Sequence, residues 1–290
     1  MFFENEYLNY TVQTLSYLGC VAILFVVGKL IFHLLKSDVK IREELTEKDN
    51  FAFFITYIGY FAGLLIAIGS ILIGPEQDFF TDIIEMLAFG ALAIFFLNLG
   101  ALINDKIILR GISVKSEIVT QENVGVAIVE AGNYISTGLI IYGAVSGVSE
   151  NLVFGLLIAS LFWIVGQILF VLTAFLYQWL VPYSVLKNLK KGRIGVAIGM
   201  SAALVAIANL ISYALFGDFV SYTDTFIDLG IELALGLILL PLMRLTVEKL
   251  MLPGTNITHE IIHQSKESYG AAFLEAFAYI GSSTLIIWII

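Results

Sequence analysis

The chain has 290 residues, of which 59% are hydrophobic and only 13% charged, and its mean hydropathy is +0.93. A water-soluble domain of this size has no need of so much apolar surface, so the composition predicts an integral membrane protein. The formal net charge of −9 argues against a nucleic acid as partner.

Eight apolar stretches follow one another along the chain. Each is about 20 residues or longer, the length that a helix needs to cross a hydrocarbon core of about 30 Å. The predicted spans cover residues 12–35, 51–73, 80–103, 124–145, 152–181, 194–216, 225–252 and 269–290. Because the stretches are continuously apolar and do not alternate, we expect helices, which satisfy their own backbone hydrogen bonds in lipid, and not a β-barrel.

Lysine and arginine gather in alternate linkers. The linkers rich in positive charge are 36–50, 104–123, 183–193 and 249–268, whereas the short connections near residues 74, 147 and 217 have none. Positively charged loops stay on the cytoplasmic side, so we expect these four linkers inside and both termini outside. The same four linkers are the surface on which a cytoplasmic protein partner would dock.

The second half of the chain repeats the first. With an offset of 143 residues Leu97 matches Leu240, Lys106 matches Lys249, Gly111 matches Gly254, Glu117 matches Glu260 and Gln121 matches Gln264; with an offset of 145, Glu130 matches Glu275 and Tyr134 matches Tyr279. We expect two four-helix halves, residues 1–147 and 148–290. Each half holds two copies of a shorter unit, an outside-to-inside helix, a linker and an inside-to-outside helix.

The fold class is therefore predicted as all-α, a polytopic bundle of eight transmembrane helices built from parallel tandem repeats of helical hairpins. The second helix of each hairpin is richer in small residues, such as Gly59 and Gly63 at a four-residue spacing. That spacing lets helix backbones approach, so we expect these helices inside the bundle and the others against lipid.

The junctions between linkers and helices resemble those of the domain of unknown function 350 family, small bacterial inner-membrane proteins of four helices. The resemblance rests on Asn50 and Asn123, each followed two residues later by Ala or Gly, and on the Glu-Ile linkers at Glu117 and Glu260; Arg193 and Ser268 stand at the other two junctions. Two such units in tandem cover nearly the whole chain. The resemblance implies the architecture and a bacterial inner membrane, and it implies no catalytic residue.

Carboxyl groups within the spans are the first candidates for function, because an ionisable side chain in a membrane is costly unless it is paired or hydrated. Glu130 and Glu275 each lie six residues after the start of a span, about 9 Å inside it. Glu85 and Asp228 form a second repeat pair near the outer surface, and Glu232 lies one turn deeper than Asp228.

If the two halves pack about a pseudo-twofold axis, each of these carboxylates approaches its repeat partner. That arrangement gives an inner and an outer acidic layer along one central route for a cation or protons, and Asn98, Asn133, Asn209 and Gln167 supply further polar lining. In the alternative interpretation Glu130 and Glu275 are protonated donors that fix helix packing, while Glu85 and Asp228 are merely interfacial.

The segment from His259 to His263 matches the H-E-x-x-H pattern of zinc peptidases, in which two His bind the metal and the Glu acts as base. A third ligand is needed, and His33 is the only other histidine in the chain. Glu260, however, already has a repeat partner in Glu117, which lacks flanking His. A solvated amphipathic linker is the preferred interpretation, and we expect no cofactor.

The leading functional hypothesis is a transport protein, channel or carrier, for a small cation or protons. Its acidic route lies between two pseudo-symmetric halves. The alternatives are a scaffold that docks a cytoplasmic partner and a zinc-dependent membrane enzyme that uses the His259 to His263 segment. The fusion of two halves leaves further oligomers open.

Overall fold

The protein folds entirely into helices and short connections over the residues that the computed structural model describes, 6–73, 78–147, 151–217, 221–252, 254–264 and 267–289. Eight helices of this described part are long and apolar enough to cross a membrane. They are α1 (Glu6–Leu35), α2 (Phe51–Ile73), α3 (Phe79–Ile107), α5 (Val124–Val145), α6 (Leu152–Leu180), α8 (Ile194–Leu215), α9 (Tyr222–Met251) and α10 (Tyr269–Ile289). The prediction of an all-α, multi-pass membrane protein is confirmed.

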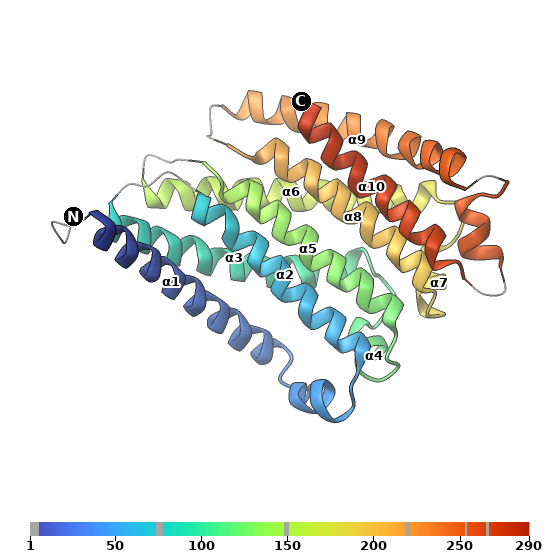
Figure 1. Ribbon diagram of the computed structural model, residues 1–290, viewed down its shortest axis with the longest axis horizontal. Coiled ribbons are helices and arrows are strands. Elements are labelled where there is room, and N and C mark those ends of the chain that lie inside the picture. Colours follow the sequence, from blue (N-terminus) through green and yellow to red (C-terminus); the bar gives the residue numbers. More distant parts are fainter. Residues whose placement is uncertain are drawn as a thin grey trace.

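A short helical turn follows the first helix of each hairpin (α1, α3, α6 and α9) and precedes the second helix of the same hairpin. These turns are η1 (Glu43–Glu47), α4 (Val114–Val119), α7 (Val185–Lys190) and η2 (His259–His263). They lie along one edge of the molecule, at the lower right of Figure 1, while both chain ends lie toward the opposite side. The hairpin unit is thus used four times in one orientation, as predicted. Residues 265 and 266 of the last linker lie outside the described residues.

The second helices of the four hairpins form one continuous row. In Figure 1, α2, α5, α8 and α10 run side by side in this order, and each packs on the next. The first helices cover this row: α3 and α6 pack on α5, and α9 packs on α8 and α10. Since α5 and α8 belong to different halves, the halves merge into one row and do not pack about a pseudo-twofold axis, the condition on which the acidic layers depended.

The row is held together by small residues that bring helix backbones into contact. Gly138 of α5 faces the backbone of Gly63 on α2, and a Cβ atom added at Gly138 would overlap the Gly63 carbonyl oxygen. On the other side of α5, Gly143 faces the backbone of Ser212 on α8 in the same way. In lipid no hydrophobic effect drives helices together, so such close packing supplies the association.

Burial follows position in the row. In the most apolar stretch of each span, 78% of the residues of α5 and 72% of those of α8 are buried, against 22% for α1 and α9. The expected division into inner and outer helices holds for these four spans. It does not separate α2 from α3, both 50% buried, because α2 has only one neighbour in the row.

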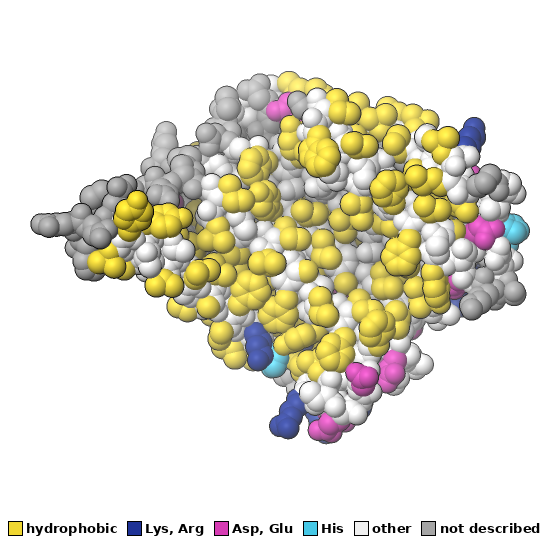
Figure 2. Space-filling model, viewed as in Figure 1, with side chains coloured by type: hydrophobic (Ala, Val, Ile, Leu, Met, Phe, Trp, Pro, Cys, Tyr) yellow, Lys and Arg dark blue, Asp and Glu magenta, His cyan; other side chains and the backbone are white. Residues whose placement is uncertain are grey.

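The remaining surface suits contact with lipid. Figure 2 shows hydrophobic side chains spread over the face in view, with most of the charged side chains at its lower and right-hand margins, where the linkers lie. Exposed residues of the spans include Ile58 and Leu65 of α2 and Leu157 of α6. The protein therefore contacts the bilayer with the flanks of its spans and keeps charge at their ends.

One side chain at each of three junctions ties a linker to the next linker along the row. The bonds run from Asn50 Nδ2 to the Ile118 carbonyl (3.0 Å), from Asn123 Nδ2 to the Leu189 carbonyl (2.9 Å) and from Arg193 Nη1 to the Ile261 carbonyl (3.2 Å). The residues that are joined lie 68, 66 and 68 positions apart in the chain, which is one hairpin unit. These three bonds are called the linker stitches.

Besides forming linker stitches, Asn50 and Asn123 each cap a helix and bond to a glutamate. The Oδ1 atom of Asn123 accepts from the Val126 N–H and so caps α5, and its Nδ2 atom also donates to Glu117 Oε2 at 2.9 Å. Asn50 caps α2 and donates to Glu44 in the same way. The Asn residues and Glu117 that carry the family resemblance are therefore structural, because they fix where each inner helix begins.

We expect Gly138→Ala to destabilise the protein by about 1–3 kcal/mol, because the added methyl group must push the α2 and α5 backbones apart. The matched control is Gly69→Ala on α2, where the new Cβ meets Tyr142 at an ordinary 3.9 Å. Thermal unfolding in detergent measures both. Equal midpoints for the two variants would contradict the contact between backbones.

Replacing Asn123 by Ala removes a helix cap, a stitch and a partner of Glu117 together, so we expect a loss of about 2–3 kcal/mol. Asn151→Ala, which removes the N-cap bond to Phe154 at the exposed start of α6, should cost about 1 kcal/mol. Chemical unfolding in mixed micelles measures the two losses. A loss no greater for Asn123→Ala than for Asn151→Ala would show that the stitch contributes nothing.

Candidate functional site

Two acidic clusters lie within the spans, one in each half. In the first, Glu130 of α5 is completely buried, and the carboxyl group of Asp105, from the last turn of α3, lies beside it. Tyr134, one turn further along α5, lies beside the same carboxyl group. We call Asp105, Glu130, Asn133 and Tyr134 the first-half cluster.

The first-half cluster is rich in buried polar atoms that have no partner. Both oxygens of Glu130, both amide atoms of Asn133 and the Oδ1 atom of Asp105 are buried without a hydrogen bond of ordinary geometry from any described residue. Ser136 Oγ on the same helix shares this state. An unsatisfied polar group in the membrane interior costs several kcal/mol, so this arrangement is unfavourable unless something further binds to it.

The helical repeat of α5 explains why these side chains gather on one side. Ala131 and Gly138 face α2, and Gly132 and Gly143 face α8, so the backbone contacts of the row use two sides of α5. With about 100° between successive residues, Glu130 and Asn133 share a third side. That side meets α3 and α6, which pack on α5 from behind the row.

A chain of hydrogen bonds next to the first-half cluster joins α3, α5 and α6. Gln167 Nε2 donates to Asn104 Oδ1 at 2.7 Å, and Asn104 Nδ2 donates to Thr137 Oγ1 at 3.4 Å. Gln167, predicted as polar lining, thus joins α3 and α6 over α5. Asn98, also predicted as lining, bonds instead to Tyr60 OH at 3.4 Å. Asn209 bonds to Ser283 between α8 and α10.

The second-half cluster consists of Arg244, Glu248, Glu275 and Tyr279. Glu275 of α10 is completely buried, and its Oε1 atom accepts from Arg244 Nε of α9 at 2.6 Å and from Tyr279 OH at 3.4 Å. Arg244 Nη2 also donates to Thr258 Oγ1 at 3.1 Å. This carboxylate is therefore paired with a cation that is itself anchored to the linker.

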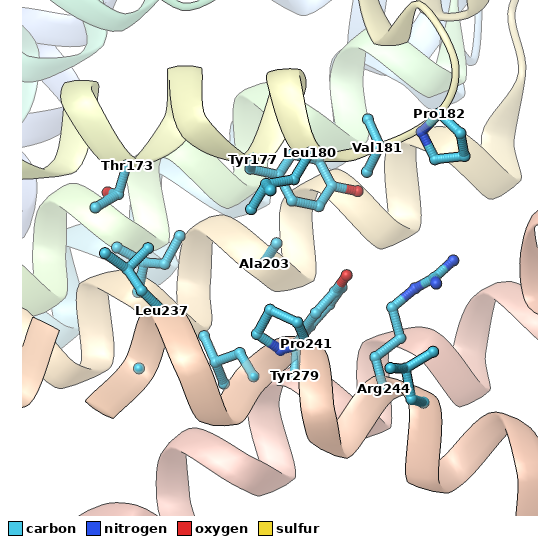
Figure 3. Close-up of a pocket in the computed structure, with 14 residues that line it drawn as sticks. Thr173, Tyr177, Leu180, Val181, Pro182, Ala203, Leu237, Pro241, Arg244 and Tyr279 are labelled. Atoms are coloured by element: carbon cyan, nitrogen blue, oxygen red, sulfur yellow. The ribbon is translucent and has the colours of Figure 1, made fainter. Parts of the chain in front are cut away.

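Two cavities meet at Arg244. Figure 3 shows the first, about 250 Å³ in volume, between α6 and α9, with Thr173 and Leu237 toward one end and Arg244 at the other. Its other lining residues are mostly apolar. A second cavity of about 400 Å³ adjoins it and is lined by polar groups that include Glu248, His259 and His263. Arg244 and Pro182 belong to the walls of both.

The structure does not bring the predicted inner pair together. Glu130 lies against α3 and Glu275 against α9, and α8 stands between their helices: Gly132 of α5 faces Ser201 of α8, and Gly199 of α8 faces the Glu275 carboxylate. The expectation that each carboxylate approaches its repeat partner is wrong, because the small residues of α8 close the space between the halves.

The outer pair is not brought together either. Glu85 belongs to α3, which packs on α1, α2, α5 and α6, whereas Asp228 belongs to α9, which packs on α8 and α10. Asp228 is exposed. Its carboxylate repels that of Glu232, which is 4% exposed and lies one turn away on the same helix. Glu232 and Asp228 thus form a local pair on α9 and are not part of an acidic layer.

The H-E-x-x-H segment forms η2, with the His259 and His263 rings 5.9 Å apart. Both oxygens of Glu260 are occupied, by Thr255 Oγ1 at 2.7 Å and Gln264 Nε2 at 2.6 Å. His33 belongs to α1, which packs on α2 and α3 at the other end of the row. Within the described ranges no three His, Cys, Asp or Glu side chains are grouped so that they could hold a metal ion.

Sequence reasoning missed Asp105 and Arg244. The repeat offset of 143 residues aligns Asp105 with Glu248, directly beside the Lys106 and Lys249 pair that defines the repeat. The equivalence of the two acids was therefore visible in the sequence. Arg244 aligns with Ala101, so the repeat itself gives no signal for it.

Comparison with known proteins gives a family for both halves. A family model described as Domain of Unknown Function (DUF350) matches residues 6–145 and again residues 151–290. A UPF0719 transmembrane protein from Aquifex aeolicus (strain VF5) is 23% identical over 201 residues, which cover 69% of this chain and 72% of the relative. No solved structure matches the chain.

Removing Arg244 alone should leave Glu275 as an unpaired buried charge, so we expect Arg244→Leu to destabilise the protein by about 3–5 kcal/mol. The double change Arg244→Leu with Glu275→Gln should recover much of that loss, because no charge is then left unpaired. Unfolding midpoints of Arg244→Leu, of Glu275→Gln, of the double variant and of the unchanged protein form a complete cycle. Additive effects of the two changes would contradict the ion pair.

Proposed function

This chain belongs, through both of its halves, to the family described as Domain of Unknown Function (DUF350), and on that premise we propose that it is a membrane transport protein for protons or a small cation, with the first-half cluster as its binding site. The observation that carries this proposal is the completely buried Glu130, which has the carboxyl group of Asp105 beside it.

The chemistry of a carboxyl pair supports the proposal. Two carboxylates offer only acceptors to each other, so Asp105 and Glu130 in contact need a proton or a cation between them. The amide oxygen of Asn133, one turn along α5, is a further neutral ligand of the kind that cations accept. Protons and small cations are therefore the species that this cluster suits.

A role in packing alone fits the first-half cluster less well. Where polar groups fix the packing in this protein, each side chain makes at least one hydrogen bond, as in the bond from Gln167 to Asn104 and in the ion pair of Arg244 with Glu275, although Gln167 Oε1 and Glu275 Oε2 have no partner among the described residues. Asn133 and Glu130 are buried to the same extent and make none with the described residues. A pair that served only packing would be selected for satisfied bonds.

The distribution of Lys and Arg supports an orientation with the four linkers in the cytoplasm and both termini outside, in a bacterial inner membrane. Glu130 would then lie about 9 Å from the cytoplasmic end of α5, one and a half turns into the helix. A proton or cation reaches such a depth from the cytoplasmic side without crossing most of the bilayer.

The test is flux into liposomes that contain the purified protein, measured separately for protons, Na⁺ and K⁺. We expect flux of at least one of these ions with the unchanged protein, and its loss with Glu130→Gln and with Asp105→Asn, because each change removes one charge of the pair. Glu47→Gln, at an exposed linker carboxylate, is the matched control and should keep full flux.

Flux that survives both substitutions would exclude the first-half cluster as the site. If the unchanged protein passes none of the three ions, the transport proposal falls, and a scaffold that docks a partner through its linkers takes its place. Unfolding midpoints must accompany the flux data, so that a loss of flux is not simply a loss of fold.

A further inference from the structure

The two acidic clusters are copies of one site. Under the repeat, the members of the first-half cluster and those of the second-half cluster correspond as Asp105 with Glu248, Glu130 with Glu275, and Tyr134 with Tyr279. The equivalent acids also lie on equivalent helices, α3 with α5 in the first half and α9 with α10 in the second. The halves thus preserve two carboxyl groups and a phenol in one arrangement.

The clusters differ in a single charge. In the second half the guanidinium group of Arg244 bonds to Glu275 at 2.6 Å, while the equivalent residue of the first half is the buried Ala101. Glu130 has no ion pair with any cation in the described ranges. Asp105 is attracted electrostatically by Lys36, which lies just beyond the end of α1. The Nζ atom of Lys36 lies over the Phe32 ring, 5.5 Å from its centroid.

Arg244 also borders two cavities. Its side chain forms part of the wall of the apolar cavity between α6 and α9 (Figure 3). It also forms part of the wall of the polar cavity beside η2. Thr258 holds the guanidinium group from the linker side, and Glu275 holds it from α10. Two hydrogen bonds thus fix the guanidinium group at the place where the walls of the two cavities meet.

We propose that Arg244 is a tethered cation that permanently fills the second-half site, and that the first-half cluster binds a mobile monovalent cation in the equivalent position. The role of that cation in transport rests on the proposed function, but its binding does not. One positive charge pairs with Glu275 through its Oε1 atom, while Glu248 accepts a separate hydrogen bond from the Ile257 N–H at 2.8 Å, so the second-half site holds a single cation. An alkali ion, ammonium or guanidinium is the class of ligand that it suits.

The first experiment measures binding without any flux. The unfolding midpoint of Arg244→Ala is followed in detergent at constant ionic strength, with guanidinium, Na⁺, K⁺ or choline chloride at low millimolar concentration. We expect the substitution to lower the midpoint and guanidinium to restore at least half of the loss, with little effect of the bulky choline. The double variant Arg244→Ala with Glu275→Gln should gain no more from guanidinium than the unchanged protein does, because only its first-half cluster can still bind the cation.

The second experiment transfers the tethered cation to the first half. In the unchanged protein the first-half cluster is free to bind a cation, so its unfolding midpoint should depend on the cation present. Ala101→Arg should abolish this dependence and also abolish flux, because the new guanidinium group occupies the site beside Glu130. Ala101→Leu adds comparable bulk without charge and is the control. If it blocks flux and cation dependence as completely as Ala101→Arg, the effect is steric and the proposal is overturned.

The outcomes separate this inference from the proposed function. Restoration of Arg244→Ala by guanidinium, with no flux in the unchanged protein, would support the cation site and end the transport proposal. Flux that depends on Glu130 but persists in folded Ala101→Arg would overturn the inference and leave transport standing. Should Ala101→Arg fail to fold, the effect of guanidinium on the midpoint of Arg244→Ala decides alone. No restoration of that midpoint would overturn the inference.

Discussion

The contact between glycine backbones along the row of inner helices is the constraint on which the rest of this structure depends. Helices in lipid gain nothing from burying apolar side chains against each other, so they associate where small residues let backbones meet, as at Gly63 and Gly138. These contacts occupy two sides of α5 and leave a third for larger polar groups. The position of Glu130 therefore follows from the glycines around it.

The sequence predicted the helices better than it predicted their neighbours. Hydropathy and the repeat were sufficient for eight spans, for the hairpin unit and for the burial of Glu130 and Glu275, because these properties depend on local composition. An offset of 145 residues shows that two positions are equivalent, but not that they touch. Whether parallel repeats form a ring or a row depends on contacts such as Gly132 with Ser201, which no single sequence reveals.

The two halves differ from each other in one way at the linker junctions and in another way at the acidic clusters. At the third junction Arg193 replaces the asparagine and still reaches the next linker, so the chemistry changed while the contact was kept. At the acidic clusters the two carboxyl groups and the tyrosine were kept, but the second half has the cation Arg244 where the first half has Ala101. The linker contact is present at three junctions, whereas the ion-paired buried carboxylate occurs, among the described residues, in only one half.

A row in which each inner helix packs chiefly on its immediate neighbours behaves as a one-dimensional chain of units, and its cooperativity declines from the middle outward. α1 lies at one end and α9 and α10 at the other, with fewer neighbours than α5 and α8 have. Hydrogen exchange should therefore begin at the two ends and reach α5 last. The unsatisfied polar groups around Glu130 are thus located on the most deeply buried span among the described residues, where local opening should be least frequent.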